Sequence, residues 1–130
     1  MIGRRGDLPQ SLHKLIVEVE EKSAEYNDTT IWVALSYGGR SEIVEAVNHA
    51  IEKGELVTEE NFEAVLWTAE MPDPDMIVRT SGEQRLSNFV TWKSVYSELY
   101  FIDKHWPALT KADFDDILHE YEQRERRKGT

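Results

Sequence analysis

The sequence predicts an α/β fold, with a parallel sheet flanked by helices on both faces and truncated at its N-terminal side. The main observation is a continuous apolar run of strand length at residues 31–35, with a second short apolar run at residues 76–78. A strand without polar alternation is typical of a parallel sheet that is covered on both faces. Segments of helical periodicity lie before, between and after these runs, which is the order expected of an α/β protein.

The first two helices are predicted from the spacing of apolar residues. One begins after Pro9, fades near residues 27–28 and has apolar residues at i, i+3, i+4 and i+7. These residues are Leu12, Leu15, Ile16 and Val19. The other helix follows the glycine pair at residues 38–39, and its apolar face comprises Ile43, Val47, Ala50 and Ile51.

The second half of the chain continues the alternation of helices and strands. Thr58 is a good N-cap for a helix that extends to about Thr68. After the strand at residues 76–78, Ser87 opens an amphipathic segment that is predicted to be helical, and residues 98–101 form the next strand. Thr110 caps the last helix, which carries the i,i+4 pairs Glu120–Arg124 and Glu122–Arg126 on its outer side. The apolar face of this helix comprises Phe114, Ile117, Leu118 and Tyr121.

The start of the chain is predicted to be the end of another strand. Residues 1–3 are apolar up to Gly3, which fits the turn after a strand. A parallel sheet of about three short strands leaves edges that proteins normally cover. We therefore expect a further element or a partner to cover this edge.

Composition excludes several classes of protein. The 130 residues carry 15 basic and 25 acidic side chains, a net charge of −10, which argues against general nucleic-acid binding. The chain has no cysteine, so disulfides and zinc–thiolate sites are excluded and a cytoplasmic location is expected. No apolar run approaches about 18 residues, so no transmembrane segment is expected. The basic N-terminus lacks the apolar region of a signal peptide.

A candidate anion site follows the strand at residues 76–78. Arg79 leads into the small polar loop at residues 80–82, and Arg85 and Ser87 follow shortly after it. Arginine offers planar, bidentate donors to phosphate, and a helix start adds partial positive charge from its amides. The alternative is a structural turn whose arginines pair with surface carboxylates. Because parallel α/β sheets bind ligands beyond the C-terminal ends of their strands, the position of this loop favours a phosphate site.

Four segments of the chain resemble the cis-prenyltransferases, the undecaprenyl diphosphate synthase (isoprenyl transferase) family. They are Y-G-G-R-x-E-I at residues 37–43, D-x-x-x-R-T-S-G-E-Q-R-L-S-N-F at 75–89, S-E-L-Y-F at 97–101 and W-P at 106–107. Their order and spacing also match, and the resemblance covers essentially the whole chain. It implies a Mg²⁺-assisted condensation of isopentenyl diphosphate with an allylic prenyl diphosphate to make a polyprenyl diphosphate, usually by a homodimer.

The resemblance also implies roles for individual residues. Arg79, Arg85 and Ser87 match the family positions that hold the diphosphate of isopentenyl diphosphate. Glu98 matches the family glutamate that helps to bind Mg²⁺, a cation that prefers carboxylate and phosphate oxygens. Asp73 and Asp75 are spaced like a metal pair, but they lie beside prolines and are interpreted as turn residues.

One family motif is absent from these residues. The family carries a metal-binding aspartate in a D-G-N-x-R motif, and no D-G-N occurs here. The resemblance therefore implies that residues 1–130 are a single partial domain, the C-terminal portion of a cis-prenyltransferase, without the family's catalytic aspartate. In this interpretation activity requires the N-terminal half, which a complementing polypeptide would supply. The alternatives are a non-catalytic remnant or regulatory subunit that dimerises with a relative, and an unrelated phosphate-binding domain.

The remaining candidates are interpreted mainly as structural. The aromatic residues of the second half are expected in the core or at a subunit interface: Trp92, Tyr96, Tyr100 and Trp106. The histidines show no spacing typical of metal ligands. Residues 126–129 resemble the family's basic tail, which can reach a neighbouring active site, although Lys128 replaces the common aromatic residue. A solvated helix end is the alternative for this tail.

Overall fold

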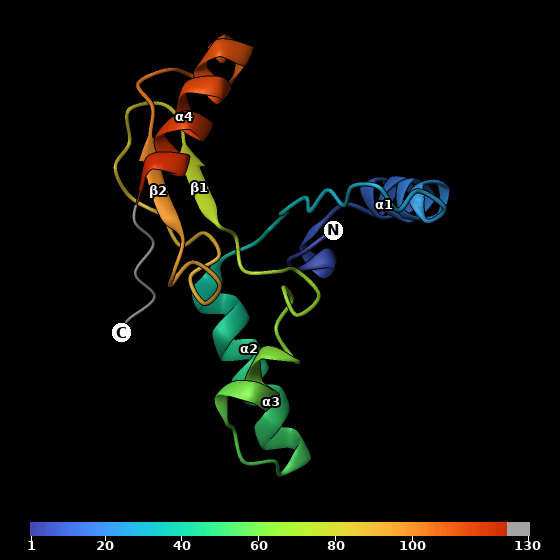
Figure 1. Cartoon of the computed structure of the whole chain (residues 1–130). Coiled ribbons are helices and arrows are strands. Elements are labelled where there is room, and N and C mark those ends of the chain that lie inside the picture. Colours follow the sequence, from blue (N-terminus) through green and yellow to red (C-terminus); the bar gives the residue numbers. More distant parts are fainter. Residues whose placement is uncertain (125–130) are drawn as a thin grey trace. The chain divides into compact units, whose positions relative to one another are not determined.

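The computed structural model of the chain describes residues 1–124 (Figure 1). Two compact units are present: one comprises Met1–Pro72 and Asn88–Val90, and the other comprises Asp73–Ser87 and the chain from Thr91 onward. The first unit contains the 3₁₀ helix η1 (Arg5–Asp7) and the helices α1 (Gln10–Ser23), α2 (Gly39–Lys53) and α3 (Glu59–Glu63). The second contains β1 (Met76–Arg79), β2 (Glu98–Phe101), the 3₁₀ helix η2 (Trp106–Ala108) and α4 (Lys111–Gln123).

The second unit is built on a parallel pair of strands, as predicted. Strands β1 and β2 run from the pair Met76↔Glu98 to the pair Arg79↔Phe101. The pairing continues past the strand ends, because the Ile102 amide donates to the Arg79 carbonyl at 2.8 Å. Apolar or aromatic side chains from both strands and from α4 are buried in this unit: Ile77, Tyr100 and Ile117. The strand at residues 98–101 is confirmed with its predicted bounds.

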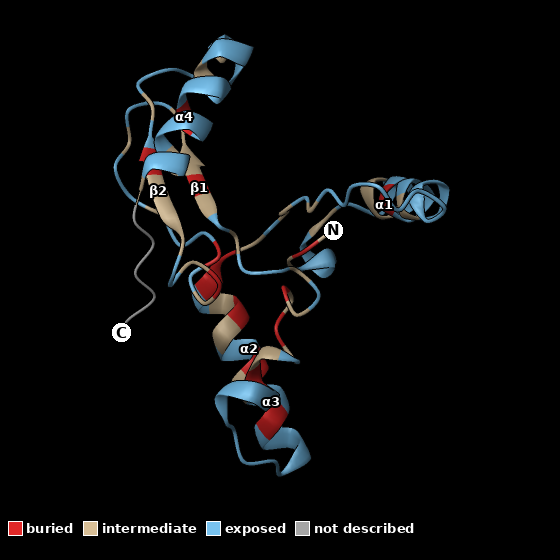
Figure 2. Ribbon diagram, viewed as in Figure 1, coloured by how far each residue is buried: buried red, intermediate tan, exposed pale blue. Residues whose placement is uncertain are grey.

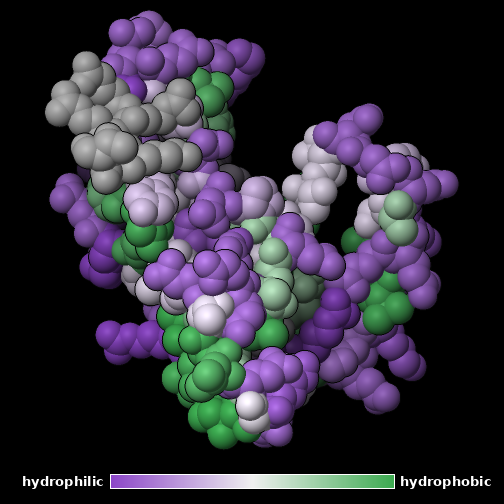
Figure 3. All heavy atoms as spheres, turned by 60° about the horizontal axis from the view of Figure 1, so that its bottom comes forward, coloured by the Kyte–Doolittle hydropathy of each residue, from purple (hydrophilic) through white to green (hydrophobic). Residues whose placement is uncertain are grey.

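The predicted strand at residues 31–35 is reduced to a single bridge. Ala34 pairs with Ile2 in parallel, and the Ile2 amide and carbonyl bond to Val33 and Leu35 at 3.0 and 3.1 Å. The expectation that both faces would be covered is wrong for the described residues, since Ile31 is 80% exposed and Val33 is 49% exposed. A strand is stabilised by backbone hydrogen bonds to neighbouring strands. Within residues 1–124, this segment forms such a bridge only with Ile2. Figure 3 shows that apolar residues, in green, reach the surface on the face that it draws.

The predicted helix after Ser87 is not formed. Residues 88–96 are turns and bends, and Ser87, Asn88 and Val90 all have positive φ values, of 49°, 67° and 38°. Left-handed backbone at successive residues is incompatible with a right-handed helix. Ser87 therefore caps no helix here, and the expectation of helix-start amides beside the two arginines is wrong.

Three helices match their predicted starts, but the end of α3 and parts of the predicted apolar faces of the other helices differ from the prediction. α1 begins after Pro9, while Thr58 and Thr110 cap α3 and α4, each through a reciprocal capping box with the residue three positions later. α3 ends at Glu63, not near Thr68, because residues 64–70 continue as turns. In α2, the buried positions are those shown in red in Figure 2, and they include Glu42, Ala46 and Ala50. The predicted apolar faces of α1, α2 and α4 are wrong at five residues that are exposed: Leu15, Val19, Ile51, Phe114 and Leu118.

The cap of α4 is expected to give the chain an acid-sensitive element. Hydrogen bonds from the Lys104 side chain, then from the Thr110 amide and hydroxyl, lower the pKa of Asp113 from 3.8 to about 2. A lowered pKa stabilises the fold above the unfolded value, and this contribution is lost as pH falls through the folded value. The difference in unfolding free energy between wild type and Asp113→Asn should therefore be constant above about pH 4 and shrink toward about pH 2. Denaturant titrations across this range measure it, and a difference that does not change with pH would contradict the assignment.

Candidate functional site

The loop after β1 is fixed by backbone hydrogen bonds to the segment after β2. The Ser81 amide donates to the Lys104 carbonyl at 2.7 Å, and the Gly82 amide donates to the Ile102 carbonyl at 3.0 Å. Ser81 and Gly82 both have positive φ, and a Cβ atom on Gly82 would lie 2.8 Å from a carboxylate oxygen of Asp103. The loop is thus closely packed, and it holds the chain beyond Arg79 at the C-terminal end of the parallel strands.

Arg79 and Arg85 both offer guanidinium groups with little competition for them. Arg79 ends β1 and is half-buried, and among residues 1–124 its side chain has no hydrogen-bond or ion-pair partner. The Arg85 side chain is 63% exposed and pairs with Glu83, whose side chain is 40% exposed. Exposed ion pairs of this kind contribute little free energy, so an anionic ligand can replace Glu83. Ser87 is exposed on the same segment, in the unit that contains both arginines.

Asn88, the next residue of the motif, has a role that sequence reasoning missed. Its side-chain oxygen accepts the Arg40 amide at 2.8 Å, and its carbonyl accepts the Gly39 amide at 2.8 Å. Asn88 therefore satisfies two of the free amides at the start of α2, which has no side-chain cap of its own. A Cβ atom on Gly38 would lie 2.6 Å from the Asn88 amide nitrogen, so the glycine leaves the space that this contact needs.

Replacement of Asn88 by alanine is expected to destabilise the chain by about 1–2 kcal/mol, because it removes a helix cap at a left-handed position. Asn88→Asp keeps the acceptor oxygen and should be close to neutral. Asn88→Gly relieves the backbone strain and isolates the loss of the cap. Denaturant unfolding monitored by circular dichroism gives the differences, and equal stability of Asn88→Ala and Asn88→Asp would argue against the capping role.

Glu98 lies at the start of β2 and is held by an arginine in this structure. Its Oε2 atom accepts Nη1 of Arg124 at 2.7 Å, and Nη2 of the same arginine donates to Glu120 at 2.5 Å. The Glu98 and Glu120 carboxylates raise the pKa of Arg124. No group of three or more potential metal-ligating side chains occurs among the described residues. Glu98 can thus contribute one carboxylate to a metal, but it does not form a metal site by itself.

Tyr100, two residues further along β2, lies under the same arginine. The guanidinium carbon of Arg124 is 4.2 Å from the centre of the Tyr100 ring, a cation–π distance. The Tyr100 hydroxyl is buried without a hydrogen-bond partner among residues 1–124, and burial raises its pKa. The expectation of a core position for Tyr100 fits this burial.

The glutamate of the Y-G-G-R-x-E-I segment is a structural residue of the first unit. Glu42 is 1% exposed, and its carboxylate accepts the Thr68 amide at 2.9 Å, the Thr68 hydroxyl at 2.8 Å and the Tyr37 hydroxyl at 2.5 Å. Burial, together with the Glu42 carboxylate, raises the pKa of Tyr37. The carboxylate thereby fastens the first turn of α2 to the chain around residue 68.

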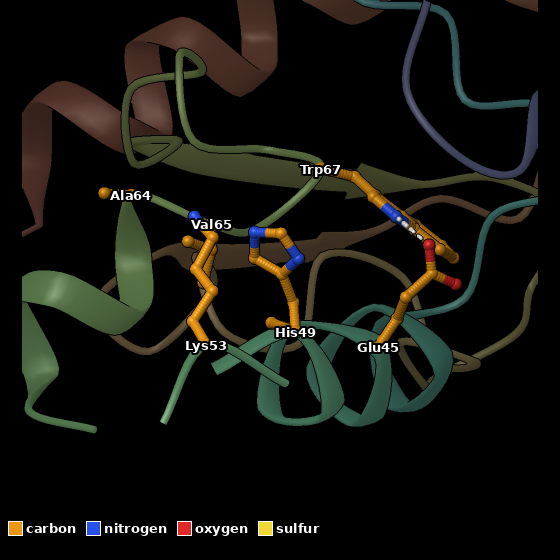
Figure 4. A pocket seen from close by; sticks show the side chains of 7 residues that line it. Glu45, His49, Lys53, Ala64, Val65 and Trp67 are labelled. Atoms are coloured by element: carbon orange, nitrogen blue, oxygen red, sulfur yellow. Dashed lines mark hydrogen bonds between the residues drawn. The ribbon is translucent and has the colours of Figure 1, made fainter. Parts of the chain in front are cut away.

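A groove of about 430 Å³ also lies in the first unit, between α2 and the segment after α3 (Figure 4). One wall is the Trp67 indole, whose N–H donates to Glu45 at 3.2 Å. Beside it, His49 and Lys53 follow Glu45 along α2 at helical spacing, and all three side chains point toward the groove in Figure 4. None of the predicted site residues lines this groove.

A family model described as a putative undecaprenyl diphosphate synthase matches residues 1–129. The chain belongs to this family. The predicted resemblance to the cis-prenyltransferases is therefore confirmed, and the family to which the chain belongs is one of prenyl transferases.

Curated cis-prenyltransferases align with nearly the whole chain. An isoprenyl transferase of Thermotoga maritima is 47% identical over 99% of this chain and 58% of its own length. An isoprenyl transferase of Fusobacterium nucleatum is 44% identical, over 98% and 55% respectively. A geranylgeranyl-diphosphate-specific tritrans,polycis-undecaprenyl-diphosphate synthase of Methanopyrus kandleri is 42% identical. The chain spans about half the length of the curated relatives it matches.

Solved structures of cis-prenyltransferases confirm the predicted fold class. A probable undecaprenyl diphosphate synthase from Campylobacter jejuni superposes with a TM-score of 0.90 at 36% identity, over 99% of this chain and 61% of its own. Lavandulyl diphosphate synthase from Lavandula x intermedia, in complex with dimethylallyl diphosphate, gives a TM-score of 0.91 at 37% identity, over 99% and 58%. None of the helices in the described part of the chain is long and apolar enough to cross a membrane. The tail at residues 126–129 and the Glu122–Arg126 pair fall outside the described residues.

Proposed function

We propose that these residues supply the isopentenyl-diphosphate-binding half of a cis-prenyltransferase, which condenses isopentenyl diphosphate with an allylic prenyl diphosphate. The observation that carries the proposal is Arg79, a half-buried cation without a partner in the described chain, at the C-terminal end of a parallel strand. A half-buried guanidinium without a counter-ion is costly, and a bound anion removes that cost. Membership of the prenyl diphosphate synthase family makes a prenyl diphosphate the best candidate for that anion.

The diphosphate would accept hydrogen bonds from three side chains, those of Arg79, Arg85 and Ser87. Each guanidinium presents parallel N–H donors that match two phosphate oxygens, and the Ser87 hydroxyl adds a single donor. Charge-assisted hydrogen bonds of this kind contribute about 1.5–3 kcal/mol each. Binding of the diphosphate would fix the position of the attached isopentenyl group relative to the second substrate.

Glu98 is proposed as one ligand of Mg²⁺. A single carboxylate is enough for a metal–diphosphate complex, because Mg²⁺ is usually held by one or two carboxylates together with substrate phosphates and water. Glu98 and Arg79 lie at opposite ends of the strand pair, so the assignment of Glu98 rests on its match to the family motif. The donor set does not fit a bare ion held by protein alone, since Glu98 is a single carboxylate that already pairs with Arg124. When bound, the ion would neutralise negative charge on the diphosphates as the allylic one departs.

The allylic half of the site would come from residues outside these 130. A D-G-N-x-R segment is absent from the sequence, and no residue of this chain is assigned to ionisation of the allylic diphosphate. We propose that an N-terminal half, carried by a complementing polypeptide, supplies it, that the chain forms a homodimer, and that the assembly acts in the cytoplasm. The same absence supports a second candidate, in which this chain is a non-catalytic or regulatory partner of a full-length relative.

Equilibrium dialysis with radiolabelled isopentenyl diphosphate tests the binding proposal. Saturable binding is expected, and inorganic diphosphate should displace the label at much lower concentrations than inorganic phosphate, because the proposed site holds both phosphate groups of a diphosphate. Absence of saturable binding, or equal displacement by the two anions, would contradict the proposed site. Binding of isopentenyl diphosphate is compatible with both candidate functions. They differ in whether the assembly that contains this chain uses it for prenyl transfer.

A further inference from the structure

Arg124 joins the end of α4 to the proposed metal ligand. Its guanidinium lies between two carboxylates, with Nη1 at 2.7 Å from Glu98 and Nη2 at 2.5 Å from Glu120. The side chains of Arg124 and Glu98 are 33% and 27% exposed, so the pair is partly shielded from water. The carboxylate that the proposed function gives to Mg²⁺ is thus already neutralised by a cation of the same chain.

We propose that Arg124 competes with the divalent metal for Glu98, so that binding of the metal–diphosphate complex requires release of this arginine. The inference rests on the proposed role of Glu98 as a metal ligand. A divalent ion and a guanidinium on one carboxylate repel each other, and partial shielding from water strengthens that repulsion. Arg124 would therefore offset the charge of Glu98 before the substrates bind and oppose metal binding without them.

The surroundings of Arg124 make its release feasible. On leaving Glu98, the guanidinium retains its ion pair with Glu120, which lies one turn earlier on the same helix. It can also retain its position over the Tyr100 ring, at 4.2 Å from the ring centre. Because Arg124 keeps its contacts with Glu120 and Tyr100, replacement of the arginine by a metal at Glu98 needs no rearrangement of α4. An arginine that merely oriented Glu98 for the metal would have the opposite effect on metal affinity, and this difference makes the proposal testable.

Mn²⁺ binding to the whole chain in the presence of isopentenyl diphosphate, measured by electron paramagnetic resonance, distinguishes the two roles. Arg124→Gln is expected to tighten Mn²⁺ binding about threefold to tenfold, in line with the modest net free energy of a partly exposed ion pair. Arg124→Lys keeps the charge but loses the second donor, and should lie between wild type and Arg124→Gln. Lys111→Gln, which removes a cation from the same helix and from the exposed pair with Asp115, is the matched control and should not change the affinity.

The outcomes separate this inference from the proposed function. Unchanged or weaker Mn²⁺ binding by Arg124→Gln, in a chain whose binding is lost with Glu98→Gln, would overturn the competition and leave the metal ligand in place. Binding that is insensitive to Glu98→Gln, or absent in every variant, would overturn the metal role of Glu98 and the inference with it. Circular dichroism of each variant verifies that the fold is retained.

Discussion

Replacement of both Arg79 and Arg85 by alanine is expected to weaken binding of isopentenyl diphosphate by roughly 10²–10⁴-fold, the equivalent of two lost charge-assisted contacts. The effect should be large because Arg79 is half-buried and Arg85 can exchange its exposed partner Glu83 for the ligand. Isothermal titration calorimetry on the purified chain measures the loss. Folding should be unaffected, since the Arg79 side chain has no described partner and the Arg85 pair is exposed.

Variants with lysine at the same positions show whether binding depends on the positive charge alone or also on the planar shape of the guanidinium group. Lysine keeps the positive charge but lacks the planar fork that matches two phosphate oxygens, so Arg79→Lys with Arg85→Lys should give an intermediate loss. Lys22→Ala, which breaks an exposed pair with Glu18 on α1, is the control for a general reduction of positive charge. Binding that survives the double alanine replacement would remove both arginines from the site.

Replacement of Glu42 by alanine is expected to destabilise the chain by roughly 3–5 kcal/mol, since it leaves two buried donors and one part-buried donor without an acceptor. These donors are the Thr68 amide, the Thr68 hydroxyl and the Tyr37 hydroxyl. Such a loss is a large part of the net stability of a small domain, about 5–15 kcal/mol. Denaturant unfolding measures the loss, and a shift in the midpoint at unchanged slope is expected.

Two variants on the same helix show whether burial of the carboxylate is the cause. Glu42→Gln keeps an acceptor oxygen for Thr68 and should cost much less than Glu42→Ala. Glu52→Ala removes an exposed glutamate of α2 and should have little effect. A small loss for Glu42→Ala, similar to that for Glu52→Ala, would mean that the buried network does not stabilise the first unit.

Capping residues and a proline in the sequence correctly predicted where three helices begin, because a helix start depends on residues close together in the chain. The caps at Thr58 and Thr110 and the helix start after Pro9 are formed within a few residues of chain, and they are confirmed. The helix expected after Ser87 failed because residues 88–90 are instead fixed by packing and hydrogen bonds in the first unit, including those of Asn88 to residues 39 and 40. That contact joins residues 48 positions apart, and the local pattern of residues contains no trace of it.

Contacts between residues far apart in the sequence were also missed at the candidate site. Residue types and spacing identified Arg79, Arg85 and Ser87 as candidates, and the family resemblance added Glu98. The roles of all four residues stay predictions until binding is measured. The pair between Glu98 and Arg124 was not predicted, because the pattern placed Arg124 only in an i,i+4 pair with Glu120. That pair is formed, and the packing of α4 beside β2 adds the second carboxylate. The sequence thus predicted candidate residues for the site but not the ion pair between Glu98 and Arg124.

Prenyl transfer from farnesyl diphosphate to radiolabelled isopentenyl diphosphate with Mg²⁺ is the most direct test of the central claim. These 130 residues alone should give no polyprenyl product, and addition of a polypeptide that carries the D-G-N-x-R half should give product that depends on Arg79 and Arg85. Product from the 130 residues alone would contradict the division of the site into two halves. Absence of product with the second half present, while isopentenyl diphosphate still binds, would favour the non-catalytic partner.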